Sequence, residues 1–136
     1  MNTRNIVLDT CVLVQLSKDH KEVVRLKKML KGKNVTFIIP DVVVQELYHV
    51  AQITKSEIPK LLSYFGKKIF FDSVKPHKTS ALQIHSQFHD SHFSDSQILA
   101  LCQAKDYILI TFDKALLRVC NMINAVAFHP KYSGNL

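Results

Sequence analysis

The chain contains little of the residues that build linkers or disulfide scaffolds. Its 136 residues include no tryptophan, three glycines, four prolines and three cysteines. We therefore expect no long linker or low-complexity tract, and a single tightly built domain spanning residues 1–136. Cys11, Cys102 and Cys120 form no CxxC pair and leave one residue over from any pairing. We expect reduced core thiols in a cytoplasmic protein.

Long apolar runs are missing as well. No stretch approaches the roughly 18 apolar residues of a membrane-spanning helix, so we expect no such helix. The apolar segment near the N-terminus, IVLDTCVLV, is interrupted by Asp9, and this interruption argues against a signal peptide. The hydrophobic fraction of 47% is ordinary for a soluble globular chain.

Acidic residues are scarce compared with basic ones. There are 11 aspartates and glutamates against 18 lysines and arginines, and the net charge is +7. A small basic protein is attracted to polyanions such as nucleic acid or an anionic membrane. Seven basic residues lie between residues 18 and 33. This run is either a solvated helix face or an RNA contact, in which case Lys27, Lys28 and Lys31 are the expected RNA-binding residues.

The apolar pattern predicts strands that alternate with helices. Strands are expected at residues 5–8, 35–39, 68–71, 107–111 and 125–128. Helices are expected at residues 12–16, 19–30, 42–53, 56–65, 79–88, 94–104 and 114–122. Asp41 is expected to cap the helix that begins at residue 42. This alternation indicates an α/β protein with a parallel sheet covered by helices on both faces.

Four acidic residues are expected at the carboxyl edge of this sheet, where open α/β sheets bind their ligands. Asp9 follows the first strand, and Glu46 lies in the early turns of the helix after the second strand. Asp95 opens a helix that runs antiparallel to the strands, and Asp113 follows YILIT. Each of them alone is explained by a helix cap or a turn. Their convergence on one edge points instead to a shared site.

Neighbouring carboxylates repel one another, so they retain a proton or bind a divalent cation. Oxygen ligands without thiolate or imidazole favour Mg²⁺ or Mn²⁺. Such an ion polarises a phosphoryl oxygen and lowers the pKa of an attacking water. Together with the basic surface, the four acids predict metal-dependent hydrolysis of phosphodiester bonds in nucleic acid.

Three histidines, His85, His89 and His92, have spacings of four and three that are found in helical zinc sites. No fourth ligand is evident, and Ser91 with Phe93 indicates that the helix has ended. We therefore favour histidines that face solvent near the mouth of the site and contact RNA.

Four segments in this order, VLDTCVL, VVVQEL, SDSQILALC and ILITFDKAL, resemble PIN-domain ribonucleases. The resemblance is greatest to the small toxin branch (VapC-like) of toxin–antitoxin pairs, and it covers nearly the whole chain. It implies an α/β fold, a three-layer α/β/α sandwich with a central mostly parallel sheet. It also implies Mg²⁺- or Mn²⁺-dependent cleavage of single-stranded RNA, a homodimer, and an antitoxin protein whose tail blocks the site.

The resemblance matches the family's four acids to Asp9, Glu46, Asp95 and Asp113, as catalytic residues and metal ligands. Thr111 matches a hydroxyl residue that often precedes the fourth acid. Thr10 either adds a hydroxyl near the metal or caps its helix. Ala115 and Leu116 stand where some relatives carry another acid, so the number of ions, one or two, stays open.

Two other functions stay open at the level of the sequence. A non-catalytic RNA-binding or scaffold domain would have the same fold, but the complete set of four acids argues against it. A phosphatase with an aspartate nucleophile needs a second aspartate two residues after the first, and this chain has Cys11 there.

Overall fold

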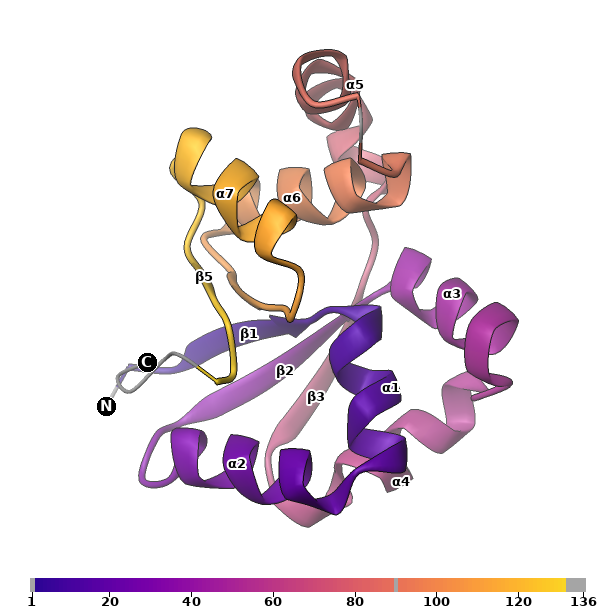
Figure 1. Ribbon diagram of the computed structural model, residues 1–136, viewed down its shortest axis with the longest axis vertical. Helices are drawn as coiled ribbons and strands as arrows, with labels where there is room; N and C mark the ends of the chain where they lie inside the picture. The colour runs from indigo at the N-terminus through magenta and orange to yellow at the C-terminus, as the bar shows by residue number, and fades with distance from the viewer. Residues whose placement is uncertain (1, 90, 132–136) are drawn as a thin grey trace.

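A computed structural model describes residues 2–89 and 91–131 (Figure 1). Five strands form one sheet in the order β3-β2-β1-β4-β5, and each neighbouring pair is parallel. The strands are β1 (Arg4–Leu8), β2 (Val35–Pro40), β3 (Lys68–Asp72), β4 (Ile108–Ile110) and β5 (Ala127–Phe128). Val7 of the central strand pairs with Ile38 on one side and with Leu109 on the other. The predicted mostly parallel α/β sheet is confirmed.

Helices cover both faces of the sheet, which confirms the predicted three-layer arrangement (Figure 1). One face carries α1 (Thr10–Lys18), α2 (His20–Leu30), α3 (Asp41–Ala51) and α4 (Ile58–Leu62). The other carries α5 (Lys78–Gln87), α6 (Phe93–Lys105) and α7 (Lys114–Met122). The chain changes faces after β3 because its next strand, β4, pairs on the far side of β1 and crossovers are right-handed. No helix of the described residues is long and apolar enough to cross a membrane.

The core lies between these layers, with β1 at its centre. Ile6, Val7 and Leu8 are fully buried, as are Phe37 and Ile39 of β2. A strand buried on both faces is apolar at every position, which is the pattern of IVL. Asp9, which follows β1 directly, is therefore attached to a strand that is buried on both faces.

Residues 56–65, predicted as one helix, form three short turns. A 3₁₀ turn at Lys55–Glu57 precedes α4, and a second one at Ser63–Phe65 follows it. Thr54 starts the segment with a capping box, because its backbone N–H and hydroxyl donate to Glu57 Oε1 at 3.0 and 2.7 Å. Gly66 ends the segment at φ +62°, a conformation that favours glycine.

The remaining boundaries differ from the prediction by a few residues. The strand predicted at 107–111 is limited to β4, and that predicted at 125–128 is limited to the two residues of β5. The backbone N–H of Thr111 still donates to the carbonyl of Phe128, at 3.1 Å. The sheet pairing therefore continues to the point where the site begins.

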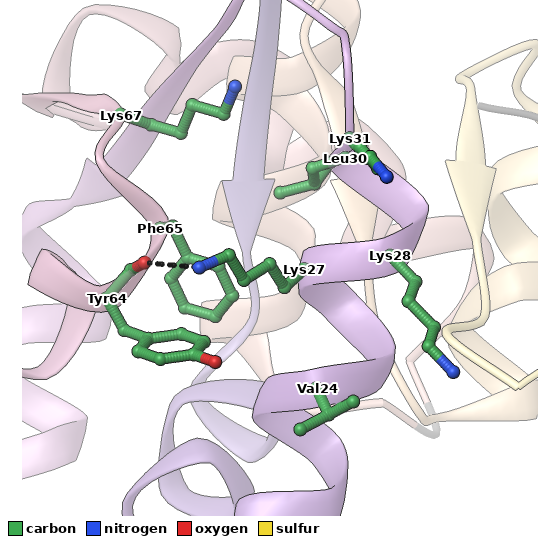
Figure 2. A pocket seen from close by; sticks show the side chains of 8 residues that line it. All are labelled: Val24, Lys27, Lys28, Leu30, Lys31, Tyr64, Phe65 and Lys67. Atoms are coloured by element: carbon green, nitrogen blue, oxygen red, sulfur yellow. Dashed lines mark hydrogen bonds between the residues drawn. The ribbon is translucent and has the colours of Figure 1, made fainter.

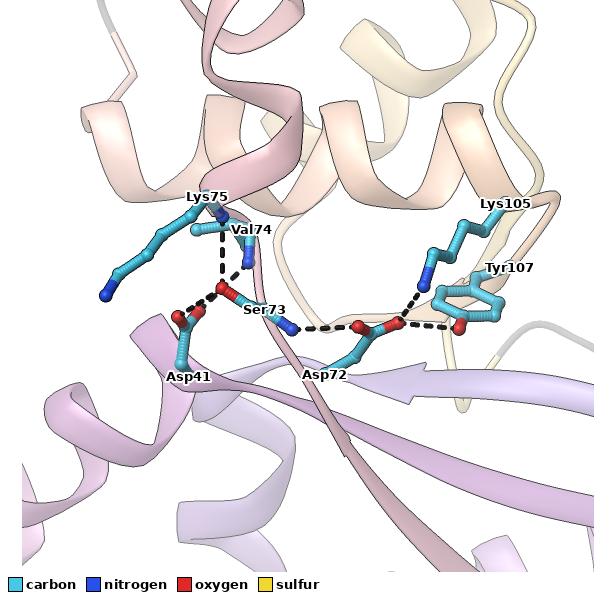
Figure 3. A network of polar contacts seen from close by, with 7 residues as sticks. All are labelled: Asp41, Asp72, Ser73, Val74, Lys75, Lys105 and Tyr107. Carbon is cyan, nitrogen blue, oxygen red and sulfur yellow. Dashed lines mark hydrogen bonds and ion pairs between the residues drawn. The ribbon is translucent and has the colours of Figure 1, made fainter.

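A polar network ties the end of β3 to both neighbouring layers (Figure 3). Asp72 Oδ2 accepts bonds from Lys105 Nζ at 2.8 Å and from the Tyr107 hydroxyl at 2.7 Å. Asp41 Oδ2 accepts from the Ser73 hydroxyl at 2.9 Å, and Asp41 Oδ1 accepts from Val74 N–H at 3.1 Å. The prediction that Asp41 caps α3 is wrong. Pro40 occupies the cap position and Asp41 is the first helical residue. The carboxylate of Asp41 binds the loop after β3.

Candidate active site

Asp9 lies at the carboxyl end of β1, with 7% of its surface exposed. It is the N-cap of α1, since its Oδ1 accepts a bond from Thr10 N–H at 2.8 Å. Its Oδ2 accepts from the Thr111 hydroxyl at 2.8 Å and from the Cys11 thiol at 3.4 Å. The alternative in which Thr10 caps the helix is wrong, because Asp9 occupies that position.

Glu46 reaches the same place from α3. Its Oε1 accepts a bond from the Thr10 hydroxyl at 2.5 Å, and its Oε2 accepts from the Ser94 hydroxyl at 3.4 Å. Thr10 therefore holds the Glu46 carboxylate with its side chain and Asp9 with its backbone. Ser94, which the sequence analysis did not single out, adds a contact from α6.

Asp95 and Asp113 belong to the helices on the other face. Asp95 lies in the first turn of α6, and Asp113 is the N-cap of α7, where its Oδ1 accepts from Ala115 and Leu116 N–H at 2.9 and 3.2 Å. The fully buried Thr111 connects Asp113 to Asp9, because its hydroxyl also accepts a bond from Asp113 N–H at 3.1 Å.

The structure brings all four predicted acids to one cavity of about 370 Å³ at the carboxyl edge of the sheet. Its lining residues come from both helical layers. They are Asp9, Thr10, Cys11, Val14, Gln15, Glu46, Val50, His92, Asp95 and Asp113. The catalytic and metal-binding roles of these acids are still predictions, whereas their convergence is a property of the fold.

Burial and mutual repulsion change the titration of this cluster. Burial, together with the charges of Asp9, Asp113 and Glu46, raises the pKa of Asp95 to about 6. Burial also raises the pKa of Asp9, although the hydrogen bonds from Thr111 and Thr10 oppose the change. The raised pKa values mean that the ionised carboxylates are unfavourable in this site, and a bound cation would stabilise them.

Cys11 is a member of the cavity that sequence analysis placed in the core. It is half-buried, and its sulfur lies 3.7 Å from Thr111 Oγ1 and donates to Asp9. Burial and the nearby Asp9 charge raise the pKa of the Cys11 thiol to about 12, so it is a neutral hydrogen-bond donor. In the sequence, the signal that Cys11 belongs to the site is its position two residues after Asp9, at the start of a helix.

The donor chemistry of the cavity fits a hard divalent cation such as Mg²⁺ or Mn²⁺. Carboxylate and hydroxyl oxygens line it, and burial, followed by the charges of neighbouring carboxylates, raises the pKa values of Asp9 and Asp95. Among residues 2–89 and 91–131, however, no three histidine, cysteine, aspartate or glutamate side chains are spaced to hold a metal ion. Mg²⁺ is commonly held by one or two carboxylates and keeps several water ligands, so this spacing is compatible with the donor chemistry of the cavity.

The three histidines lie in different surroundings. His92, at the N-cap of α6, is exposed and lines the acidic cavity. His89 lines an adjoining cavity, and His85 packs its ring against Phe93 with the centroids 5.4 Å apart. His92 is therefore the histidine that lies at the mouth of the carboxylate cluster.

The lysines predicted to contact RNA lie elsewhere. Lys27, Lys28 and Lys31 line a pocket of about 310 Å³ with Tyr64 and Phe65 (Figure 2). Lys27 Nζ lies 3.9 Å from the centroid of the Tyr64 ring. Helix α2 leads into the amino end of β2, so this pocket is at the opposite edge of the sheet from the acids. The structure does not bring these lysines and the four acids together.

The chain is similar to known proteins both in its sequence pattern and in its fold. The family model described as PIN domain matches residues 6–122, which include all four acids. No curated protein sequence matches the chain.

Several solved structures share the fold at low sequence identity. VapBC2 from Rickettsia felis, bound to a DNA fragment from its promoter, has a TM-score of 0.67 at 16% identity, covering 92% of this chain and 98% of that one. FitAcB from Neisseria gonorrhoeae has a TM-score of 0.64 at 19% identity, covering 94% and 99%. A toxin–antitoxin complex from Klebsiella pneumoniae has a TM-score of 0.58 at 16% identity, covering 79% and 86%.

Proposed function

Because this chain belongs to the PIN domain family, we propose that it is a divalent-metal-dependent endoribonuclease that cleaves single-stranded RNA. We further propose that it acts in the cytoplasm as the toxin of a type II toxin–antitoxin pair. The observation that carries the proposal is the convergence of Asp9, Glu46, Asp95 and Asp113 on one cavity.

The four acids would hold one or two Mg²⁺ or Mn²⁺ ions. Such an ion, when bound, polarises a phosphoryl oxygen and lowers the pKa of the attacking water. The chain itself prepares the site. Thr111 orients Asp9, and Thr10 orients Glu46. Asp95, with a pKa of about 6, is mostly ionised at neutral pH, so the cavity carries its negative charge before the substrate arrives.

The proposed partners extend this function. The similar Klebsiella pneumoniae structure is a toxin–antitoxin complex, and by extension we propose an antitoxin protein that covers the acidic cavity. We also propose a homodimer. Lys27, Lys28 and Lys31, at the far edge of the sheet, would contact RNA remote from the cleaved bond.

Cleavage of end-labelled single-stranded RNA by the purified chain tests the proposal. We expect cleavage with Mn²⁺ or Mg²⁺ and none with excess EDTA. Asp95→Asn should lower the rate at least roughly a hundredfold, because it removes a metal-binding carboxylate. Asp19→Asn is the control, since Asp19 also lies at the start of a helix but is outside the cavity.

Undiminished cleavage in EDTA would contradict the metal mechanism. A wild-type chain that binds RNA in Mn²⁺ without cutting it would instead favour the non-catalytic RNA-binding alternative. A normal rate for Asp95→Asn would show that Asp95 has no catalytic role and belongs only to the first turn of α6.

A further inference from the structure

A second cavity, of about 470 Å³, adjoins the acidic one. It lies between α7 and the segment that connects α5 to α6. The two cavities share His92, Asp95 and Asp113 as lining residues. A ligand seated in the larger cavity would therefore touch the carboxylate cluster, so this cavity is a continuation of the candidate active site.

One wall is a face of α7 whose composition differs from that of an ordinary solvated helix face. Ala115, Arg118, Val119 and Met122 line the cavity at the spacing of successive helical turns. Met122 is 66% exposed, and Arg118 is exposed. An exposed apolar side chain next to a cation is a surface that contacts a ligand with both apolar and anionic parts.

The opposite wall supplies aromatic and basic groups. Phe88 is half-buried, while His89 and His92 are exposed. Negative charge enters this cavity at the shared end, through Asp95 and Asp113. Arg118 lies further along α7 than Asp113, the N-cap of that helix, so the wall formed by α7 has a carboxylate at one end and a guanidinium beyond it.

These features match the chemistry of a nucleotide. Bases stack on aromatic and apolar side chains with little sequence preference, and guanidinium groups bind phosphate through two parallel hydrogen bonds. A phosphodiester at the acidic end would place the adjoining nucleotide beside Phe88 and Met122. Its own phosphate would then lie within the reach of Arg118.

We infer that this cavity is a subsite for the RNA nucleotide next to the cleaved bond. Arg118 binds its phosphate, and Phe88, Val119 and Met122 contact its base. The inference rests on the proposed function and deepens it, since it names the groups that position the substrate. Because bases differ in stacking strength, a subsite of this kind also gives the enzyme a modest preference for the base beside the cut.

Two exposed residues provide the test. Arg118→Gln and Met122→Ser are compared with Lys60→Gln, an exposed cation of α4 outside both cavities, and Leu82→Ser, an exposed apolar residue of α5. KM and kcat are measured in Mn²⁺ on a 12-nucleotide RNA, and the cut positions are mapped on a mixed-sequence RNA. The anisotropy of the same labelled RNA gives its Kd for each protein.

Arg118→Gln should raise KM and Kd about five- to twentyfold and leave kcat nearly unchanged, because it removes a charge-assisted contact that substrate and transition state share. Met122→Ser should weaken the preference for the base beside the cut. Both control variants should behave like wild type.

If wild type cuts RNA while Arg118→Gln and Met122→Ser retain its KM, Kd and cut positions, the subsite is wrong and the proposed function stands. If wild type does not cut RNA, the proposed function fails, and an RNA Kd that is equal for wild type and Arg118→Gln refutes the subsite as well. If Arg118→Gln weakens only the binding of a polyglutamate peptide, the cavity takes an acidic protein segment and the inference is overturned.

Discussion

At Asp9, a single side chain performs two tasks that the sequence presents as alternatives. It caps α1 through one oxygen, and with the other it accepts bonds from Thr111 and Cys11 inside the acidic cavity. A helix cap normally lies near solvent, but Asp9 is buried, with 7% of its surface exposed, because it follows the central strand of the sheet. Burial raises the pKa of Asp9 despite its three donors, so the ionised form is costly to the fold.

Replacing Asp9 by asparagine removes this cost. Without metal, Asp9→Asn should raise the melting temperature by a few degrees, because it removes one of several neighbouring negative charges and keeps a capping oxygen. It should also abolish RNA cleavage and reduce the stabilisation that Mn²⁺ gives to wild type. Thermal melts in EDTA and in Mn²⁺ measure both effects, with Asp19→Asn as the control cap. An Asp9→Asn protein that melts lower in EDTA and responds to Mn²⁺ like wild type would refute the carboxylate cluster.

The four acids were predictable because each is adjacent to a strand or helix whose position the apolar pattern indicates. Cys11 and Ser94 were not, because their roles depend on which side chains they meet across the cavity. The Cys11 sulfur lies 3.7 Å from the Thr111 hydroxyl oxygen, and Ser94 donates to Glu46 from a helix on the other face. Contacts between residues 48 or more positions apart leave no local pattern in the sequence.

At the scale of elements, α3 shows how a helix start positions a functional residue five positions later. Asp41 binds Val42 N–H, the Ser73 hydroxyl and Val74 N–H, and so ties the start of α3 to the end of β3. The sequence indicates an aspartate at a helix start, and capping is the usual explanation. The bonds to Ser73 and Val74 depend on the pairing of β2 with β3, which local propensity does not encode.

Asp41→Ala should therefore lower the free energy of unfolding by about 1–3 kcal/mol, since it leaves half-buried donors without an acceptor. Ser73→Ala, which removes the hydroxyl bond alone, should cost less than half as much. Urea denaturation of the two variants measures the difference. Equal losses would show that Asp41 acts only through Ser73.

The order of the helices was predicted well, whereas the segment around α4 was not. Its apolar residues repeat at helical spacing, but Pro59 has no N–H to donate to the carbonyl of Lys55, and Ile58 N–H donates there in a 3₁₀ turn instead. Strand β5 is shorter than its apolar run because only Ala127 and Phe128 pair with β4, itself a strand of three residues.

At the scale of the whole molecule, the acidic cavity makes stability depend on pH. Asp95 and Asp9 have raised pKa values in the folded chain, so the folded state binds more protons than the unfolded state between about pH 4 and 6. Stability then falls as pH rises through this range.

In EDTA, the free energy of unfolding of wild type should therefore decrease between pH 4.5 and 7 by about 1–2 kcal/mol through Asp95, less than the full pKa shift implies because this carboxyl is partly solvated. Asp95→Asn should show a smaller decrease. Urea denaturation at each pH gives both curves, and Glu57→Gln, which replaces an exposed carboxylate outside the cavity, is the control. A wild-type curve that rises over this range would contradict the raised pKa values.

The bond between Thr111 and Asp9 joins residues 102 positions apart in the chain. A ribosome delivers Asp9 and Glu46 early, but Asp95, Thr111 and Asp113 come only in the last third of synthesis. Until then β1 lacks its partner β4 and Asp9 lacks the hydroxyl that orients it. An unfinished chain therefore has no assembled carboxylate cluster, and the cluster forms only after the last third of the chain has been made.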